Sequence, residues 1–316
     1  MKRLFRTGGR ASARTWGRAS ALRKAALKGC PTCVLLVYGV AVAGGIAAAQ
    51  PSSARRIVSL VPAVTEMLFA VGAGPQVVGV SSFDREPVQV AALPRVGALL
   101  DPDLERILSL RPDMVVAYGT QEDLHRQLAR AGIPVFSYKH GGLAGITETI
   151  QRVGERTGHV EAANALVRDI EADLTAVRTR VASQPRPKVL LVFGRDPDSL
   201  RNVFASGGIG FLHDVLELAG GTNVLSDVRR EGLQISVEQI LAKRPEVVLE
   251  LRAEADADLE SKTRKVWRTL AAVPAVRDRR VHAMTGSEMV VPGPRIARAA
   301  ERIARLLHPS VKPVRP

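Results

Sequence analysis

Short apolar runs alternate with amphipathic segments along two stretches of the chain, residues 55–157 and 186–309. Apolar runs between turn residues are typical of buried strands, and apolar residues at intervals of three and four are typical of helices. The alternation predicts an α/β fold of two similar lobes with mostly parallel sheets. We expect strands at 56–60, 77–80, 113–118, 134–138, 189–194 and 280–284, and helices at 65–71, 104–110, 124–131, 209–219, 263–270 and 295–307.

The segment between the two stretches has a different pattern. Residues 160–183 contain neither glycine nor proline, and apolar residues recur there at intervals of three and four, from Ala163 to Val181. A helix of this length would extend about 35 Å, at about 1.5 Å per residue. Such a length suits a connection that crosses a molecule, so we expect residues 158–185 to join the two lobes.

One motif occurs twice. LERILSLRPDMVV, residues 104–116, returns as VEQILAKRPEVVL, residues 237–249, and this places Glu105 on Glu238. Each glutamate follows by two positions a residue that can cap a helix, so two interpretations stay open. Each acid could stabilise its own helix dipole, by about 0.3–1 kcal/mol. Alternatively, the pair could dock onto a two-fold symmetric partner that carries two basic patches.

The charge of the chain is unevenly distributed. The net charge of +14 would by itself suggest a nucleic-acid partner. However, the first 49 residues contain nine of the 45 Lys and Arg and none of the 31 Asp and Glu, so the rest carries only +5. That balance is ordinary for a globular protein and removes the argument for nucleic acid.

The basic N-terminal segment precedes an apolar run, residues 33–49, that ends in small residues before Gln50. A basic region, an apolar region and a small-residue end are typical of a secretory signal peptide. We therefore expect residues 1–49 to be a signal peptide or a retained N-terminal anchor, and the protein to be periplasmic. Cys30 and Cys33 both lie there, so the mature chain would lack thiol chemistry and thiolate metal sites.

Motifs along residues 55–308 carry a family resemblance. VPAVTE, GVSSF, LPRVG, LERILSLRPDMVV, GGIGFLHDVLELAGGTN, VEQILAKRPEVVL and GPRI occur in this order. Together they resemble the periplasmic substrate-binding proteins of ABC importers that have a rigid helical backbone, which carry vitamin B12, ferric siderophores or haem. Through VPAVTE, GVSSF and GPRI, the chain is most similar to the vitamin B12-binding branch.

The resemblance implies a monomer with a ligand cleft between its lobes, without a cofactor of its own or a catalytic role. It also implies delivery of the ligand to a dimeric permease through one glutamate per lobe, and by motif match these are Glu105 and Glu238. The residues that it implies for the ligand cleft are Phe83, Tyr118 and Arg295, and Phe204 is a further candidate in the second lobe.

Other ligands and functions stay open. The vitamin B12 branch usually has one cleft tryptophan near the position of Leu99 and another just before GPRI, and both are absent here. Haem or a ferric siderophore is the nearest alternative, because Tyr118, His140 or His282 could ligate iron. A secreted enzyme is a less favoured alternative, since SGGIG at 206–210 has neither a P-loop lysine nor a nucleophile elbow.

Overall fold

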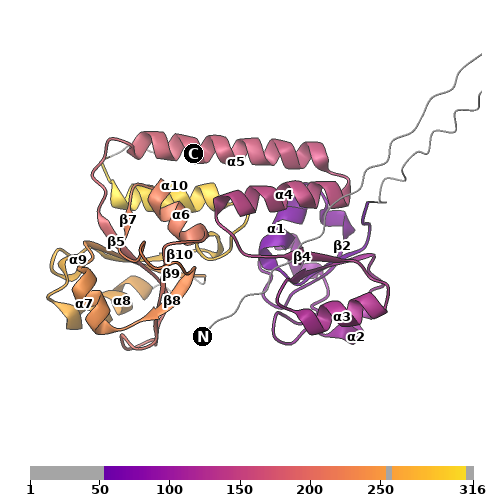
Figure 1. Ribbon diagram of the computed structural model, residues 1–316, viewed down its shortest axis with the longest axis horizontal. Coiled ribbons are helices and arrows are strands. Elements are labelled where there is room, and N and C mark those ends of the chain that lie inside the picture. The colour runs from indigo at the N-terminus through magenta and orange to yellow at the C-terminus, as the bar shows by residue number, and fades with distance from the viewer. Residues whose placement is uncertain (1–52, 254–257, 311–316) are drawn as a thin grey trace, which may run out of the picture. The chain divides into compact units, whose positions relative to one another are not determined.

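Two sheets, each with a parallel core, form the framework of the protein (Figure 1). The computed structural model describes residues 53–253 and 258–310, so the predicted signal peptide or anchor and both cysteines lie outside the described residues. The first sheet is fully parallel, with the order β2-β1-β3-β4. Its lobe contains β1 (Ile57–Ser59), β2 (Val77–Val80), β3 (Met114–Tyr118), β4 (Val135–Tyr138), α1 (Pro62–Ala70), α2 (Leu104–Ser109), α3 (Glu122–Arg130) and α4 (Leu143–Thr157).

The second sheet has the order β10-β9-β5-β6-β8, and the short β7 pairs with β5. Strands β10, β9 and β5 are parallel, whereas β6 runs antiparallel to both β5 and β8. Its lobe contains β5 (Lys188–Gly194), β6 (Val203–Ser206), β7 (Thr222–Asn223), β8 (Gly232–Ile235), β9 (Val247–Arg252), β10 (Val281–Thr285), α6 (Phe211–Leu218), α7 (Val237–Lys243), α8 (Leu259–Trp267), α9 (Pro274–Arg277) and α10 (Ile296–Leu307).

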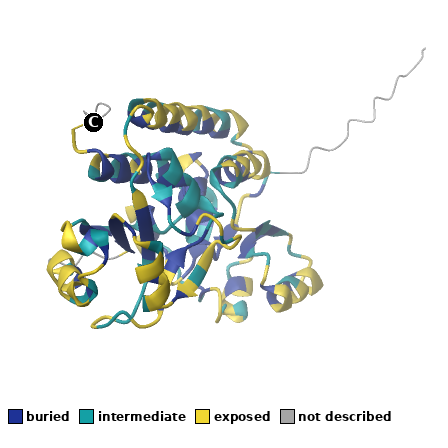
Figure 2. Cartoon of the chain, turned by 60° about the vertical axis from the view of Figure 1, so that its left-hand side comes forward, coloured by how far each residue is buried: buried dark blue, intermediate teal, exposed yellow. Residues whose placement is uncertain are grey.

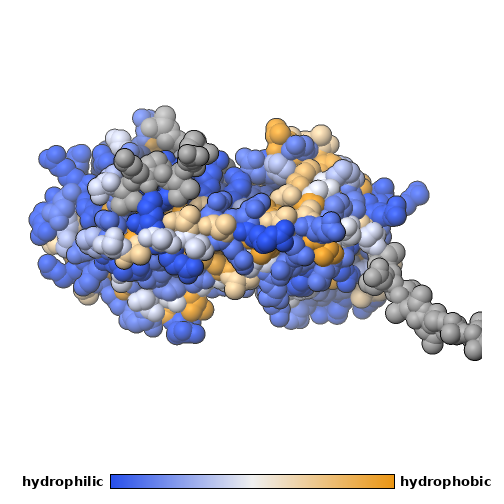
Figure 3. Space-filling model, turned by 90° about the horizontal axis from the view of Figure 1, so that it is seen from above, coloured by the Kyte–Doolittle hydropathy of each residue, from blue (hydrophilic) through white to orange (hydrophobic). Residues whose placement is uncertain are grey.

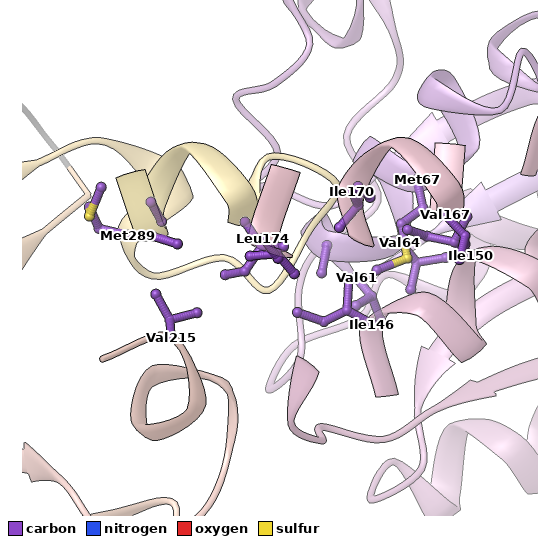
Figure 4. Packing of buried hydrophobic residues seen from close by; sticks show 14 of the residues in the cluster. Val61, Val64, Met67, Ile146, Ile150, Val167, Ile170, Leu174, Val215 and Met289 are labelled. Carbon is purple, nitrogen blue, oxygen red and sulfur yellow. The ribbon is translucent and has the colours of Figure 1, made fainter. Parts of the chain in front are cut away.

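The long helix α5 (Val160–Val181) packs against α4 of the first lobe and α10 of the second. Its buried residues belong to one continuous hydrophobic core that draws on both lobes. In Figure 4, Val167 and Ile170 lie beside Met67 and Ile150 of the first lobe, and Leu174 lies nearer the second. The predicted fold class, two α/β lobes joined by a long helix, is confirmed. On α5, Val167 is buried, whereas Leu166 is half-buried. The division into a first lobe (residues 55–157), a connecting segment (158–185) and a second lobe (186–309) remains a proposal.

Each sheet separates this shared core from a smaller core of its own. Alternate strand residues point to opposite faces of a sheet, so Ile57 and Met114 face the shared core while Val58 and Val115 pack toward α2 and α3. The second sheet packs its outer face on Trp267 and its neighbours in the same way. Figure 2 shows the resulting helices, which are buried on one side and exposed on the other.

Some elements were not expected from the sequence. Helix α4 was not predicted, because glycines interrupt its pattern. Gly154 is nevertheless needed there, since a Cβ at this position would lie 2.4 Å from the Cβ of Ala163 in α5. The antiparallel strands β6 and β8 were not predicted either. The connection between β5 and β6 spans eight residues, which is too short for a parallel crossover.

Seen from the side of α5, hydrophilic residues dominate the surface, and apolar residues occupy smaller areas (Figure 3). Among the described residues, every helix falls short of the length or the apolar character that crossing a bilayer requires.

Candidate functional site

A cavity of about 530 Å³ lies where the two lobes meet. We call it the interlobe cavity. His140, just after β4, comes from the first lobe. The second lobe supplies the remainder from the carboxyl ends of β5 and β9, the starts of β8 and α6, and Val290 before α10. Ligand sites in α/β proteins form at the carboxyl ends of parallel strands and have this order of size. The lining residues are His140, Phe193, Ile209, Gly210, Phe211, Leu212, Glu231, Gly232, Leu251, Arg252, Ala253 and Val290.

Three aromatic rings meet on the first-lobe side of the interlobe cavity. Tyr118 ends β3, Tyr138 ends β4 and His140 follows it, and their ring centroids are 5.3–5.8 Å apart. Burial raises the pKa of Tyr118, and the nearby Asp84 adds to the shift. Burial also raises the pKa of Tyr138. Both phenols are therefore protonated near neutral pH, and the half-buried Tyr118 offers a ring face and a hydroxyl donor.

The second lobe contributes another aromatic pair. Phe193, which lines the interlobe cavity, has its ring centroid 6.4 Å from that of Phe204. Gly232 makes room for Phe193, because a Cβ at Gly232 would lie 2.7 Å from the tip of its ring. Phe204, on β6, is 41% exposed, which is compatible with a position in a ligand cleft. It is outside the lining of the interlobe cavity.

Arg252 is a cationic group of the interlobe cavity that the sequence reasoning missed. Its Nη2 donates to Oε1 of Glu250 at 2.7 Å, and Glu250 is completely buried in β9. The other oxygen of Glu250 accepts from Nε of Arg195 at 3.0 Å and from Nε1 of Trp267 at 3.1 Å. One carboxylate thus holds two guanidinium groups, so this cluster carries one net positive charge, while Glu231 adds an acidic group to the cavity lining. The sequence signal for this cluster was Glu250, an acidic residue inside the otherwise apolar run VVLEL.

Arg295 makes a different contact from the one expected. It forms a two-point ion pair with Glu66 of α1, with Nη2–Oε1 at 2.6 Å and Nε–Oε2 at 3.0 Å, and Nη2 also donates to Oγ of Ser287. Burial raises the pKa of Glu66, while Arg295 opposes that shift. The pair joins the two lobes and lines a second cavity of about 290 Å³. Arg295 is outside the lining of the interlobe cavity, so its ligand contact stays a prediction.

Phe83 is also outside the lining of the interlobe cavity. It is 69% exposed in the loop after β2, where its backbone N–H donates to Oγ of Ser81 at 3.0 Å. His282, in β10, lies 3.9 Å from Glu260 and is likewise outside that lining. Within residues 53–253 and 258–310, no cluster of three or more His, Cys, Asp or Glu side chains could hold a metal ion.

Asp84 follows Phe83 and is completely buried. Among the described residues, no donor reaches either carboxyl oxygen with hydrogen-bond geometry. Burial raises the pKa of Asp84 from 3.8 to about 6, although the nearby Thr65 side chain, the backbone at Ser81 and the charge of Arg95 oppose the shift. An acid whose pKa rises on folding favours the folded state only while it is protonated. The stability that depends on Asp84 is therefore full below about pH 4 and is lost as the pH rises through 6.

We expect Asp84→Asn to raise the free energy of unfolding at pH 8 and to change it little at pH 4. The gain at pH 8 is at most about 3 kcal/mol, because each pKa unit corresponds to about 1.4 kcal/mol. Urea unfolding at the two pH values measures it, with Asp123→Asn, an exposed acid of α3, as the matched control. An equal effect at both pH values would contradict the assignment.

The two copies of the repeated motif form α2 and α7, one in each lobe. Asp103 and Ser236 cap them by accepting from the backbone N–H three residues on. Just after each helix lies an arginine in the left-handed conformation, with φ of 47° at Arg111 and 48° at Arg244. Glu105 and Glu238 are both exposed. In Figure 1 both helices lie on the side of their sheets opposite α5.

Comparisons with known proteins agree on one family. A family model described as periplasmic binding protein matches residues 57–287. A vitamin B12-binding protein of Yersinia pestis is 27% identical over 264 residues, which cover 83% of this chain and 89% of that protein. The periplasmic vitamin B12 binding protein of Vibrio cholerae has a TM-score of 0.70 at 26% identity, over 81% of this chain and 98% of that one. A periplasmic haem binding protein of Pseudomonas aeruginosa has a TM-score of 0.73 at 26% identity, over 83% and 95%.

Proposed function

Because the chain belongs to the periplasmic binding protein family, we propose that it is the solute-binding component of an ABC importer and captures a corrinoid of the vitamin B12 type. The observation that carries the proposal is the interlobe cavity, to which the second lobe contributes mainly apolar and aromatic side chains and the first lobe contributes His140. A flat, partly apolar ring system fits such a lining. The sequence similarity to vitamin B12-binding proteins supports the choice of a corrinoid.

The proposed ligand contacts come from both lobes. His140 and Tyr118 offer aromatic faces from the first lobe, and Phe193 does so from the second. Phe83, Phe204 and Arg295 remain predicted contacts, which a small closure of the lobes would have to bring to the ligand. That closure should be small, because α5 packs into one core with both lobes.

The proposed partner is a dimeric permease in the inner membrane, which the protein meets from the periplasm. Glu105 and Glu238 would dock onto two basic patches related by the permease's two-fold axis. Their exposure on equivalent helices, on the same side of the two sheets, supports this role.

Haem is the second candidate ligand. The observation that favours it is the adjacency of Tyr118 and His140 beside the cavity, since both residue types ligate haem iron. The similarity to a haem binding protein points the same way. Ligation by Tyr118 would need its phenol to lose a proton, and burial opposes that loss. A bound ferric ion would have to supply the compensating charge.

Calorimetric titration of residues 50–316 with cyanocobalamin, haem and a ferric siderophore tests the proposal. Micromolar or tighter binding of cyanocobalamin, and weaker binding of the other two, is the expected result. Calorimetry is preferable to fluorescence because Trp267, the tryptophan of this segment, is completely buried. No cyanocobalamin binding at about millimolar concentration would remove the corrinoid assignment.

Substitution of Tyr118 separates the two ligands. For a corrinoid, Tyr118→Ala should weaken binding about tenfold through lost aromatic contact, and Tyr118→Phe should leave it within about threefold. For haem held by the phenolate, Tyr118→Phe should remove the charge-transfer absorption and weaken binding as much as Tyr118→Ala does. Val160→Ala, an exposed position on α5, is the control and should leave both ligands unaffected.

A further inference from the structure

The outer faces of α2 and α7 match each other beyond their glutamates. From Leu104 to Met114 and from Val237 to Val247, the buried, half-buried and exposed positions follow one another in the same order. The strands that follow are paired alike too: β3 pairs with β1 from Met114 to Ile57, and β9 pairs with β5 from Val247 to Val189. The two helices therefore present equivalent surfaces, one on each lobe.

Leu108 and Leu241 are such a feature. They occupy the same position of the motif, and each is 38% exposed. Each lies three residues after its glutamate, which puts the two side chains on one face of the helix. Their neighbours Ile107 and Ile240 point inward and are buried. A single exposed leucine needs no explanation, but here the same acidic and apolar pair occurs at the same address in both lobes.

We propose that Leu108 and Leu241 are apolar anchors of the permease-docking surface, one beside each docking glutamate. The inference rests on the proposed function and deepens it, because it specifies the partner. The permease should offer, at two places related by its two-fold axis, a basic side chain next to an apolar hollow. An exposed acid beside each leucine, at the same position of both lobes, suits a two-fold symmetric partner with basic groups. Neither leucine lines the interlobe cavity, so ligand binding does not account for their exposure.

The two kinds of side chain should act on different rate constants. Charges at the edge of an interface steer association and make it sensitive to salt. Apolar side chains act after contact, by removing their surface from water, and so set the lifetime of the complex. Substitution of the leucines should therefore speed dissociation, whereas substitution of the glutamates should slow association.

The test uses the full chain and its permease–ATPase complex in nanodiscs, with binding followed by biolayer interferometry. Leu108→Gln and Leu241→Gln should each speed dissociation about tenfold, and the double variant about a hundredfold, with the association rate within about twofold of wild type. Leu108→Met and Leu241→Met should retain the wild-type lifetime. Val160→Gln, which changes an apolar residue 45% exposed on α5, is the matched control and should have no effect.

A wild-type dissociation rate for the double Leu→Gln variant overturns the inference. If charge reversal at the two glutamates still slows association in that case, the docking role of α2 and α7 is retained and only the role of the leucines is refuted. If neither set of variants changes binding, the docking role of both helices is refuted as well. Ligand binding is measured separately by calorimetry, so a failure of the proposed ligand is distinguishable from all of these outcomes.

Discussion

Reversing the charge of both docking glutamates is expected to abolish transport. Glu105→Lys with Glu238→Lys would place two positive charges against the basic groups that the permease is proposed to offer, and like charges across an interface cost several kcal/mol. Uptake by proteoliposomes should fall about a hundredfold or more. Ligand affinity should stay unchanged, because neither residue lines the interlobe cavity.

The control must separate docking from helix stability, since each reversal also removes a favourable interaction with a helix dipole of about 0.3–1 kcal/mol. Glu161 occupies the second position of α5, as Glu105 does in α2, and is exposed. Glu161→Lys, alone and with Glu171→Lys farther along α5, should leave transport intact. Transport by the docking variant at the wild-type rate would refute the docking role.

Removing the carboxylate of Glu250 is expected to cost about 3–5 kcal/mol of stability, the typical loss when one partner of a buried ion pair is deleted. Glu250 is completely buried and the side chain of Arg195 is 2% exposed, so Glu250→Ala leaves a buried cation without its counter-ion. It also removes the acceptor of Trp267 and of Arg252. Urea unfolding measures the change.

Glu260→Ala is the matched control, because Glu260 pairs with Arg264 one helical turn away and both are about half exposed. Exposed pairs of this kind contribute less than about 0.5 kcal/mol. Glu250→Gln should fall between the two, since the amide oxygen still accepts one hydrogen bond. A loss below about 1 kcal/mol for Glu250→Ala would mean that Arg195 reaches water in the variant.

Glu250→Ala should also weaken ligand binding, because Arg252 loses its anchor in the interlobe cavity.

None of the four ligand residues predicted from the sequence lines the interlobe cavity. Tyr118 lies in the aromatic group beside the interlobe cavity. Arg295 instead pairs with Glu66, which lies 229 residues earlier in the chain, and local sequence does not indicate so distant a partner. Arg252 and Phe193 were missed as cavity residues for the same reason, because their position depends on how the two lobes face each other.

Local periodicity alone determined the long helix α5, the two-lobed α/β class and most of the alternating strands and helices, but not α4, β6 or β8. The reason is that burial of one face imposes spacings of two and of three to four residues on the chain. The repeat at 104–116 and 237–249 likewise determined that each lobe carries an equivalent short helix followed by a strand. The tertiary structure decided what lies between the lobes: the interlobe cavity, the pair of Glu66 and Arg295, and the position of Arg252. These depend on contacts between segments far apart in sequence, which side-chain spacing within one segment does not encode.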